Sequence, residues 1–264
     1  MKNKSVWRNG FALVVVLCMA TSVSHAQIWV GPKAGFQGSR FFFEKPDAQE
    51  LYNEGIWMGW NAGWVSNFDI VDGWSLAVDM VYSEKSRTYS AVLPTDIVFR
   101  HRATYSFIDI SPLLRYSFGS LPRHYYVNVG PVIGLWAGGR GRLETEFTIE
   151  AGFDNGYRYT IVFDEDRQTI DENLWVRDGN RVQVGIEAGI GAQFDILYDK
   201  RIQVDLRYQM GHSNLGGPEG GDFGFGGIGY FDNFEGVHHV AQLSVAFLTA
   251  FEFKEFRDRS YLVK

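Results

Sequence analysis

From Ile28 onward, apolar and polar residues alternate with a period of two, and no stretch shows the 3.6-residue period of an amphipathic helix. The segment 182–194 is typical: one face is an unbroken apolar row, and the other carries glycine, glutamine and glutamate. Such alternation predicts β-strands, with one face in an apolar environment. We expect eight strands, near residues 28–42, 56–68, 73–84, 103–118, 124–137, 181–196, 201–212 and 238–253.

The connections between these strands alternate in length. The short ones are 69–72, 119–123 and 197–200; the long ones are 43–55, 85–102, 138–180 and 213–237. Short turns at one end and long loops at the other are typical of outer-membrane barrels, and an even strand number places both termini at the turn end. The sequence therefore predicts an all-β fold: an eight-stranded antiparallel up-and-down transmembrane β-barrel with short periplasmic turns and long extracellular loops.

The connection 138–180 has internal structure of its own. Asp154-Asn155-Gly156 stands between alternating flanks in the segment 147–163, which is a strong hairpin signal. Several charged residues precede this segment and argue against burial in lipid: Arg140, Arg142, Glu144 and Glu146. We expect the neighbouring strands to carry a β-hairpin above the membrane, and a ten-stranded barrel is the alternative.

The N-terminus has the features of a secretory signal peptide. A basic head containing Lys2, Lys4 and Arg8 precedes an apolar run and a small-residue cleavage site that ends at Ala26. The run is shorter than the roughly 20 residues that a membrane-spanning helix needs. We therefore expect a signal peptide at 1–26, a barrel at 27–253 and a periplasmic tail at 254–264. Cys18 is the only cysteine of the chain, so the mature protein is expected to contain no disulfide.

Net charge limits the classes of partner. Without the three basic residues of the signal peptide, 22 basic residues remain against 31 acidic ones, a formal net charge of −9. Bulk charge of this sign argues against nucleic-acid binding. The expected partners are outer-membrane lipid and, through the long loops, other envelope proteins.

The apolar face of each strand is expected to contact lipid. These faces run for about 9–11 residues, the length that a tilted strand needs to span a bilayer. Backbone polar groups in lipid must all be paired, which a closed barrel achieves. Aromatic residues at the strand ends indicate interfacial girdles: Trp29, Trp57, Trp60, Phe68, Trp74, Tyr116, Phe118, Tyr125, Phe194, Tyr208 and Phe253.

The opposite faces then place charged residues in the lumen. The expected polar network is Lys33, Asp79, Asp109, Arg115, Glu187, Asp205, Arg207 and Glu252. Five acids against three bases predict a paired network without full neutralisation, since ionised groups in a narrow lumen must be paired or hydrogen-bonded. An eight-stranded barrel is just wide enough for its own side chains. We therefore expect a filled lumen and no diffusive pore.

Two constellations could carry chemistry. His212-Ser213, at the end of an expected strand, is similar to the His-x-Ser motif of an outer-membrane lipid A deacylase, but adjacent strand residues face opposite sides and the histidine would not reach the serine. An acidic group at 164–178 could hold Ca²⁺, but its residues follow neither EF-hand nor repeat spacing: Asp164, Glu165, Asp166, Asp171, Glu172 and Asp178. We expect no catalytic residues, no cofactor and no metal.

The stretches YSFIDISPLLRYSFG, YYVNVGPVIGLWAGG and RYQMGHSNLG resemble the small outer-membrane β-barrels of Bacteroidetes, a porin-like family that includes the PorT type. The resemblance covers essentially all of the mature chain, and it implies the fold and a place in the cell envelope, with secretion complexes among the settings. It carries no catalytic residue. Three functions follow for testing: a structural or interaction protein, a porin for small solutes, and a lipid-modifying enzyme, in that order.

Overall fold

The structure, a computed structural model, describes residues 28–45, 53–92, 98–120, 122–144, 156–163, 173–176, 179–197, 199–217, 219–223 and 231–251. Its core is a ring of eight antiparallel strands, closed by pairing of the last strand with the first. The ring strands are β1 (Ile28–Phe43), β3 (Trp57–Val71), β4 (Trp74–Val92), β5 (Val98–Ser120), β6 (Arg123–Glu144), β9 (Val182–Leu197), β10 (Lys200–Gly211) and β13 (Gly236–Phe251). The eight-stranded prediction is confirmed, and the ring is not ten-stranded.

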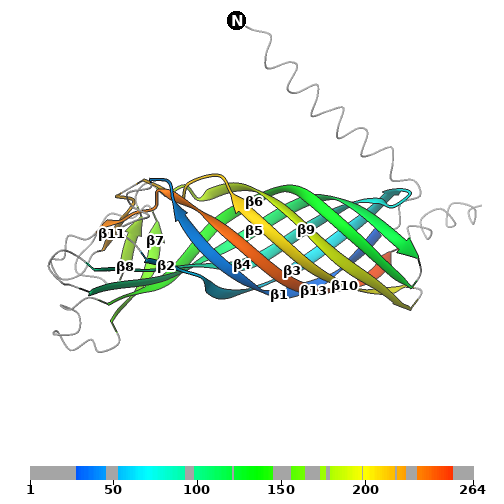
Figure 1. Ribbon diagram of the computed structural model, residues 1–264, viewed down its shortest axis with the longest axis horizontal. Coiled ribbons are helices and arrows are strands. Elements are labelled where there is room, and N and C mark those ends of the chain that lie inside the picture. Colours follow the sequence, from blue (N-terminus) through cyan, green and yellow to red (C-terminus); the bar gives the residue numbers. More distant parts are fainter. Residues whose placement is uncertain are drawn as a thin grey trace, which may run out of the picture.

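The connections are sorted between the two ends of the barrel. At the turn end, β3 is joined to β4 by Asp72-Gly73, and Gly73 has a φ of +83° that favours glycine. Ile28 pairs with Phe251, so β1 begins and β13 ends at this same end (Figure 1, right). The expected signal peptide, C-terminal tail and Glu252 lie outside the described residues.

The strands at the loop end are longer than predicted. Pairing of β4 with β5 continues to Val92 and Val98, so the expected loop 85–102 is mostly a two-stranded extension of the barrel, and that prediction is wrong. β6 likewise continues to Glu144 beside β5. In 83–90 the alternation of hydropathy is lost because both faces of the strand are largely polar there. The pairing between strands nevertheless continues through this segment. The end of the apolar pattern thus marks the end of the lipid-facing band and not the end of the strand.

Five short strands gather at this loop end (Figure 1, left). They are β2 (Asn53–Gly55), β7 (Tyr157–Phe163), β8 (Asn173–Val176), β11 (Gly221–Phe223) and β12 (Phe231–Asp232). The second flank of the expected hairpin forms β7, which pairs with the outer part of β6; its first flank lies outside the described residues. Within the described ranges, no helix is long and apolar enough to cross a membrane.

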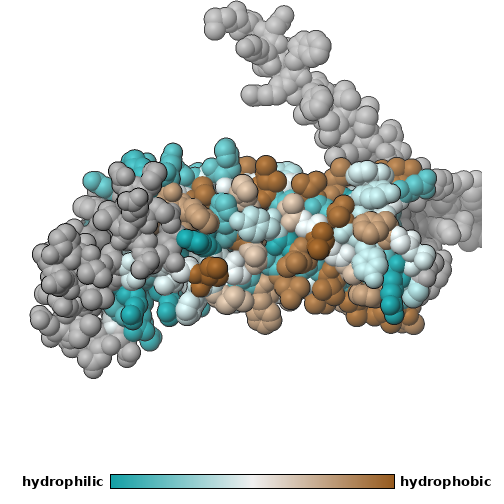
Figure 2. Space-filling model, in the orientation of Figure 1, coloured by the Kyte–Doolittle hydropathy of each residue, from teal (hydrophilic) through white to brown (hydrophobic). Residues whose placement is uncertain are grey.

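An apolar band covers the outside of the barrel, and Figure 2 shows it as brown side chains toward the turn end. Met80, Ile110 and Leu243 within it are 43–57% exposed, which is the exposure expected of side chains that lipid covers. Trp29, which the sequence placed in the aromatic girdle, is instead 3% exposed and lies under the guanidinium of Arg201 at 3.9 Å. Its position in the period-2 pattern explains this, since it shares a face with the inward residue Lys33.

Close strand packing in the barrel wall predicts an asymmetry between two glycines. A Cβ on Gly63 would lie 2.2 Å from the Met80 carbonyl oxygen, whereas one on Gly38 would meet only flexible side chains at 3.4 Å or more. We expect Gly63→Ala to destabilise the barrel by about 1–3 kcal/mol, as overpacking does, and Gly38→Ala to leave it unchanged. Urea unfolding in detergent micelles measures both, and equal stabilities of the two variants would contradict the close contact.

Candidate functional site

A network of buried ion pairs crosses the middle of the lumen. Lys33 Nζ lies 2.7 Å from Asp79 Oδ2 and 3.3 Å from Asp205 Oδ2. Arg207 Nη1 donates to Asp79 at 2.8 Å and to Glu187 at 3.0 Å, while Nη2 donates to Asp205 at 3.1 Å. The five side chains come from β1, β4, β9 and β10, and each is at most 3% exposed. The structure therefore brings five of the eight expected lumen residues into one cluster.

Asp109, the sixth of the expected lumen residues, pairs with a basic residue that the sequence analysis missed. Lys85 Nζ donates to Asp109 Oδ1 at 3.0 Å, and Ser83 Oγ donates to Oδ2 at 2.6 Å. Lys85 was assigned to a loop, but it continues the inward face of β4 through Asp79 and Ser83, and this parity could have identified it. With Lys85, the described part of the set contains four acids and four bases, so the expected excess of acid is not observed within it.

Arg115 is the seventh residue, and it stands apart from the central cluster. Its guanidinium lies 4.0 Å from the centre of the Tyr126 ring, and the Tyr126 hydroxyl donates to Asp205. Arg115 is 1% exposed, and its nitrogens have no hydrogen-bond acceptor among the residues that the structure describes. The cation–π contact with Tyr126 is thus the main interaction of Arg115 within the part of the chain that the structure describes.

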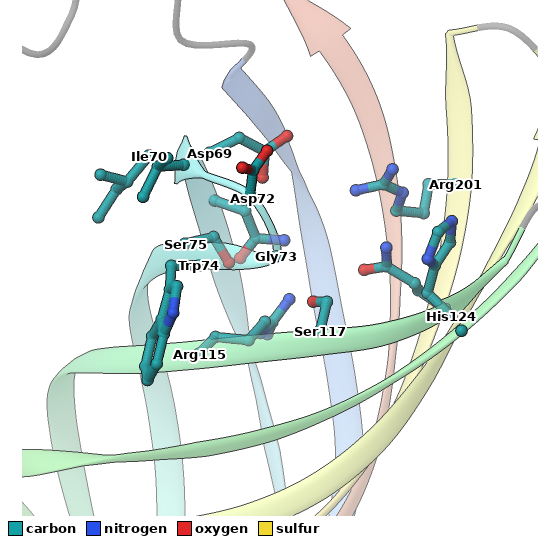
Figure 3. A pocket seen from close by; sticks show the side chains of 14 residues that line it. Asp69, Ile70, Asp72, Gly73, Trp74, Ser75, Arg115, Ser117, His124 and Arg201 are labelled. Carbon is teal, nitrogen blue, oxygen red and sulfur yellow. The ribbon is translucent and has the colours of Figure 1, made fainter.

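Below Arg115, a vestibule of about 610 Å³ opens at the turn end. Asp69 and Asp72 lie on one side of it, and His124 and Arg201 lie on the other (Figure 3). Arg201 is also paired with Asp195, at 2.6 Å. The cavity enclosed by the central network, in contrast, has about 10 Å³, no more than a single water molecule needs. The vestibule therefore does not continue as a water-filled path through the described lumen.

The loop end of the lumen is closed by an aromatic cluster that the sequence analysis did not predict. We call it the mouth plug: Phe41, Tyr89, Tyr105, Phe107, Trp136, Tyr159 and Phe234, together with aliphatic neighbours such as Leu143 and Leu215. The Trp136 ring lies 5.4 Å from Tyr105 and 5.5 Å from Phe234, edge to face. Phe234 belongs to the last long connection and is fully buried, so part of that connection folds into the barrel mouth.

A buried ion pair fixes this segment in the mouth, and we call it the mouth latch. Arg87 on β4 bonds the carboxylate of Asp232 and donates to the Asn233 carbonyl at 2.7 Å. The Tyr89 hydroxyl donates to Asp232 at 3.0 Å, and the Arg87 guanidinium lies 4.7 Å from the Phe41 ring. Removing one partner of such a pair leaves an uncompensated buried charge, so the latch holds the last connection in place.

His101 on β5 lies beside the latch and beyond the apolar band, where its outward neighbours are the exposed residues Arg100 and Arg102. Its Nε2 is bonded to the Tyr159 hydroxyl and lies 4.0 Å from Asp232. Burial lowers the pKa of His101 to about 4, although Asp232 acts to raise it, and Arg87 lowers it further. The imidazole is therefore neutral in the folded protein at neutral pH.

The two chemical constellations have different outcomes. His212 is exposed, while Ser213 Oγ accepts from the Val184 N–H at 2.7 Å and donates to Gln183 at 3.2 Å. No hydrogen bond joins His212 to Ser213 in the described structure, so the serine is engaged by β9. The six acidic residues of the expected group within 164–178 fall outside the described residues. Inside them, no cluster of three histidine, cysteine or acidic residues could hold a metal ion.

Comparison with known proteins finds a matching family model and several similar solved structures. The family model described as "Outer membrane protein beta-barrel domain" matches residues 24–215. Similar solved structures include Neisserial surface protein A (11% identity, 85% of this chain, 97% of that chain, TM-score 0.36). They also include OprG from Pseudomonas aeruginosa (9% identity, 86% of this chain, 96% of that chain, TM-score 0.40). A third is Ail of Yersinia pestis in complex with sucrose octasulfate (12% identity, 85% of this chain, 99% of that chain, TM-score 0.35). No curated protein matches the sequence.

The central network predicts a large cost for losing its shared base. Arg207→Met would leave Asp79 and Asp205 paired with Lys33 alone and Glu187 with no ion-pair partner among the described residues, and we expect a loss of about 3–5 kcal/mol in the free energy of unfolding. Arg100→Met is the matched control, because its pair with Glu144 is exposed and contributes about 1 kcal/mol or less. Urea unfolding in micelles measures both variants, and similar losses would argue against a coupled network.

The depressed pKa of His101 predicts acid sensitivity of the mouth plug. The unfolded chain takes up the proton near pH 6.5 and the folded chain near pH 4, so stability is full above 6.5 and falls as the pH drops between these values. Through His101, the free energy of unfolding falls by about 1.4 kcal/mol per pH unit in this interval, and by up to about 3 kcal/mol in all. His101→Gln should remove this contribution and so reduce the slope of the profile seen by near-UV circular dichroism. The exposed control His212→Gln should reproduce the original slope, and an unchanged slope in His101→Gln would refute the assignment.

Proposed function

The chain belongs to the outer membrane protein beta-barrel domain family, and we propose that it serves the Gram-negative outer membrane as a closed barrel with a structural or interaction role. The observation that carries the proposal is closure at two levels. The central ion pairs leave about 10 Å³ between them, and the mouth plug fills the loop end with buried aromatic rings. A barrel filled in this way offers its surface and not its lumen.

We propose that the turn end faces the periplasm and the loop end faces outside, with both termini in the periplasm. The sorting of short turns and long connections supports this orientation. The loop end is also where β4, β5 and β6 extend past the apolar band and carry the short strands. Recognition by loops on a rigid scaffold is common, and the mouth latch supplies rigidity to this end.

The partner class that fits best is another envelope protein, with the barrel as an accessory subunit of an envelope complex. The resemblance to the PorT-type barrels of Bacteroidetes supports a secretion complex as one such setting. Copurification from native membranes in mild detergent, followed by mass spectrometry, identifies the partner. Recovery of the barrel alone after crosslinking in intact cells would count against the accessory role.

A porin for small solutes is the second candidate, and one observation favours it: a vestibule of about 610 Å³ already opens into the barrel at the turn end. Opening would require movement of both the latch and the central network. A lipid-modifying enzyme has less support, because the hydroxyl of Ser213 is already bonded to β9.

Planar bilayer conductance separates the first two functions. We expect no stable openings from the native chain, and none from Arg87→Ala, because the central network still blocks the lumen after the latch is broken. Arg100→Ala, an exposed arginine near the same end, is the matched control. Stable openings of the native chain, or openings that appear only in Arg87→Ala, would favour the porin.

A further inference from the structure

The outward surface of the loop end carries arginines that the lumen and mouth do not use. Where β5, β6 and β7 extend past the apolar band, the register places Arg102 opposite Arg142 and Arg142 opposite Arg158. One step closer to the band, Arg140 pairs with Thr104 on one side and Thr160 on the other. We call Arg102, Arg140, Arg142 and Arg158 the arginine row.

This arrangement is electrostatically unfavourable on its own. Like charges directly opposite one another on neighbouring strands destabilise a sheet. Glu144 pairs with Arg142 at 2.6 Å and with Arg100 at 3.3 Å, and Glu84 lies 3.7 Å from Arg140. These two carboxylates face five arginines when Arg100 is counted, so a formal excess of three positive charges remains in the described surface. An anion bound at the row would relieve this repulsion.

The surface has room for such an anion. A cavity of about 490 Å³ lies over β5, β6 and β7, and the arginine row lines it together with the hydroxyl-bearing residues Thr104 and Thr160. Guanidinium groups bind phosphate oxygens in a bidentate fork, and threonine hydroxyls add further donors. The chemistry of this lining therefore matches a phosphate group. The cavity is larger than one free phosphate ion would fill.

The row also lies level with apolar side chains that are exposed. Gly55 pairs with Thr88, which pairs with Arg102, so the row and the start of β3 are at the same height on the barrel. Next to Gly55, Ile56 is 71% exposed, and the Trp57 ring lies 3.8 Å under the Arg102 guanidinium. Cationic and apolar side chains thus meet at one level, which suits a ligand with a charged head and an acyl chain.

We propose that the arginine row binds the phosphate groups of a lipid, and that in the orientation proposed above this lipid is a phosphorylated glycolipid of the outer leaflet. The arginines hold the phosphates, and the acyl chains lie against the apolar band beside Ile56. Only the choice of leaflet rests on the proposed orientation. Phosphate binding itself follows from the row and is independent of whether the lumen conducts.

Binding to the full chain in detergent micelles tests the proposal. The probes are bisphosphorylated lipid A and the same lipid after removal of its phosphates, followed by native mass spectrometry. We expect the native chain to prefer the phosphorylated lipid by at least about tenfold, and Arg102→Gln/Arg142→Gln/Arg158→Gln to lose this preference. Arg123→Gln, an exposed arginine at the turn end of β6, is the matched control and should bind as the native chain does.

Further variants and probes make the result decisive. Replacement of the same three residues by lysine keeps the positive charge but removes the bidentate geometry of the guanidinium group. This variant should retain part of the preference for phosphorylated lipid A. Inorganic phosphate identifies the source: if it binds the native chain as tightly as lipid A does, the lipid assignment is overturned. Equal lipid binding by the native chain and the glutamine variant overturns the site. If the triple variant loses the heat-modifiable gel shift of a folded barrel, the single variants Arg158→Gln and Arg102→Gln replace it in the binding test. Full retention of the preference for phosphorylated lipid A by both single variants would then refute binding at the arginine row.

Discussion

Closure of the backbone hydrogen-bond network is the constraint on which this structure depends. Lipid offers no partner for a peptide N–H or C=O group, so each membrane strand must bond to two neighbours and the sheet must close on itself. Pairing of β13 with β1 achieves this with eight strands. A ring of this size has an interior that side chains just fill, and the inward residues at its centre are thereby removed from both lipid and bulk water. The charged lumen and its ion pairs follow from that geometry.

The inward charges are stable because they are shared. Arg207 alone contacts three carboxylates, and Lys33 contacts two of the same three. Desolvation of a single ion costs several kcal/mol, and a network distributes the compensating contacts over four strands from three separate parts of the sequence. The same interactions therefore fix the register of β1, β4, β9 and β10 and block the lumen. Stability and closure are consequences of one set of contacts.

Sequence reasoning succeeded where one physical rule applied along a whole strand. Period-2 alternation located all eight ring strands, because lipid on one side and lumen on the other impose it residue by residue. It failed where the solvent changed: β4 and β5 continue into water, both faces become polar, and the expected loop 85–102 is paired strand. Lys85 was lost with that loop, and Trp29 was assigned by its residue type although its parity pointed inward.

The mouth plug could not be predicted for a different reason. Its members come from β1, β4, β5, β6 and β7 and from the connection after β10, and no local pattern records that Phe234 lies beside Trp136 or that Asp232 meets Arg87. Only the aromatic residues within the glycine-rich connection hinted at burial. Because the plug joins this connection to strands of the barrel, it holds the loop end in a defined shape. A surface such as the arginine row, whose spacing depends on the extended strands β5 and β6, is preorganised by the packing beneath it.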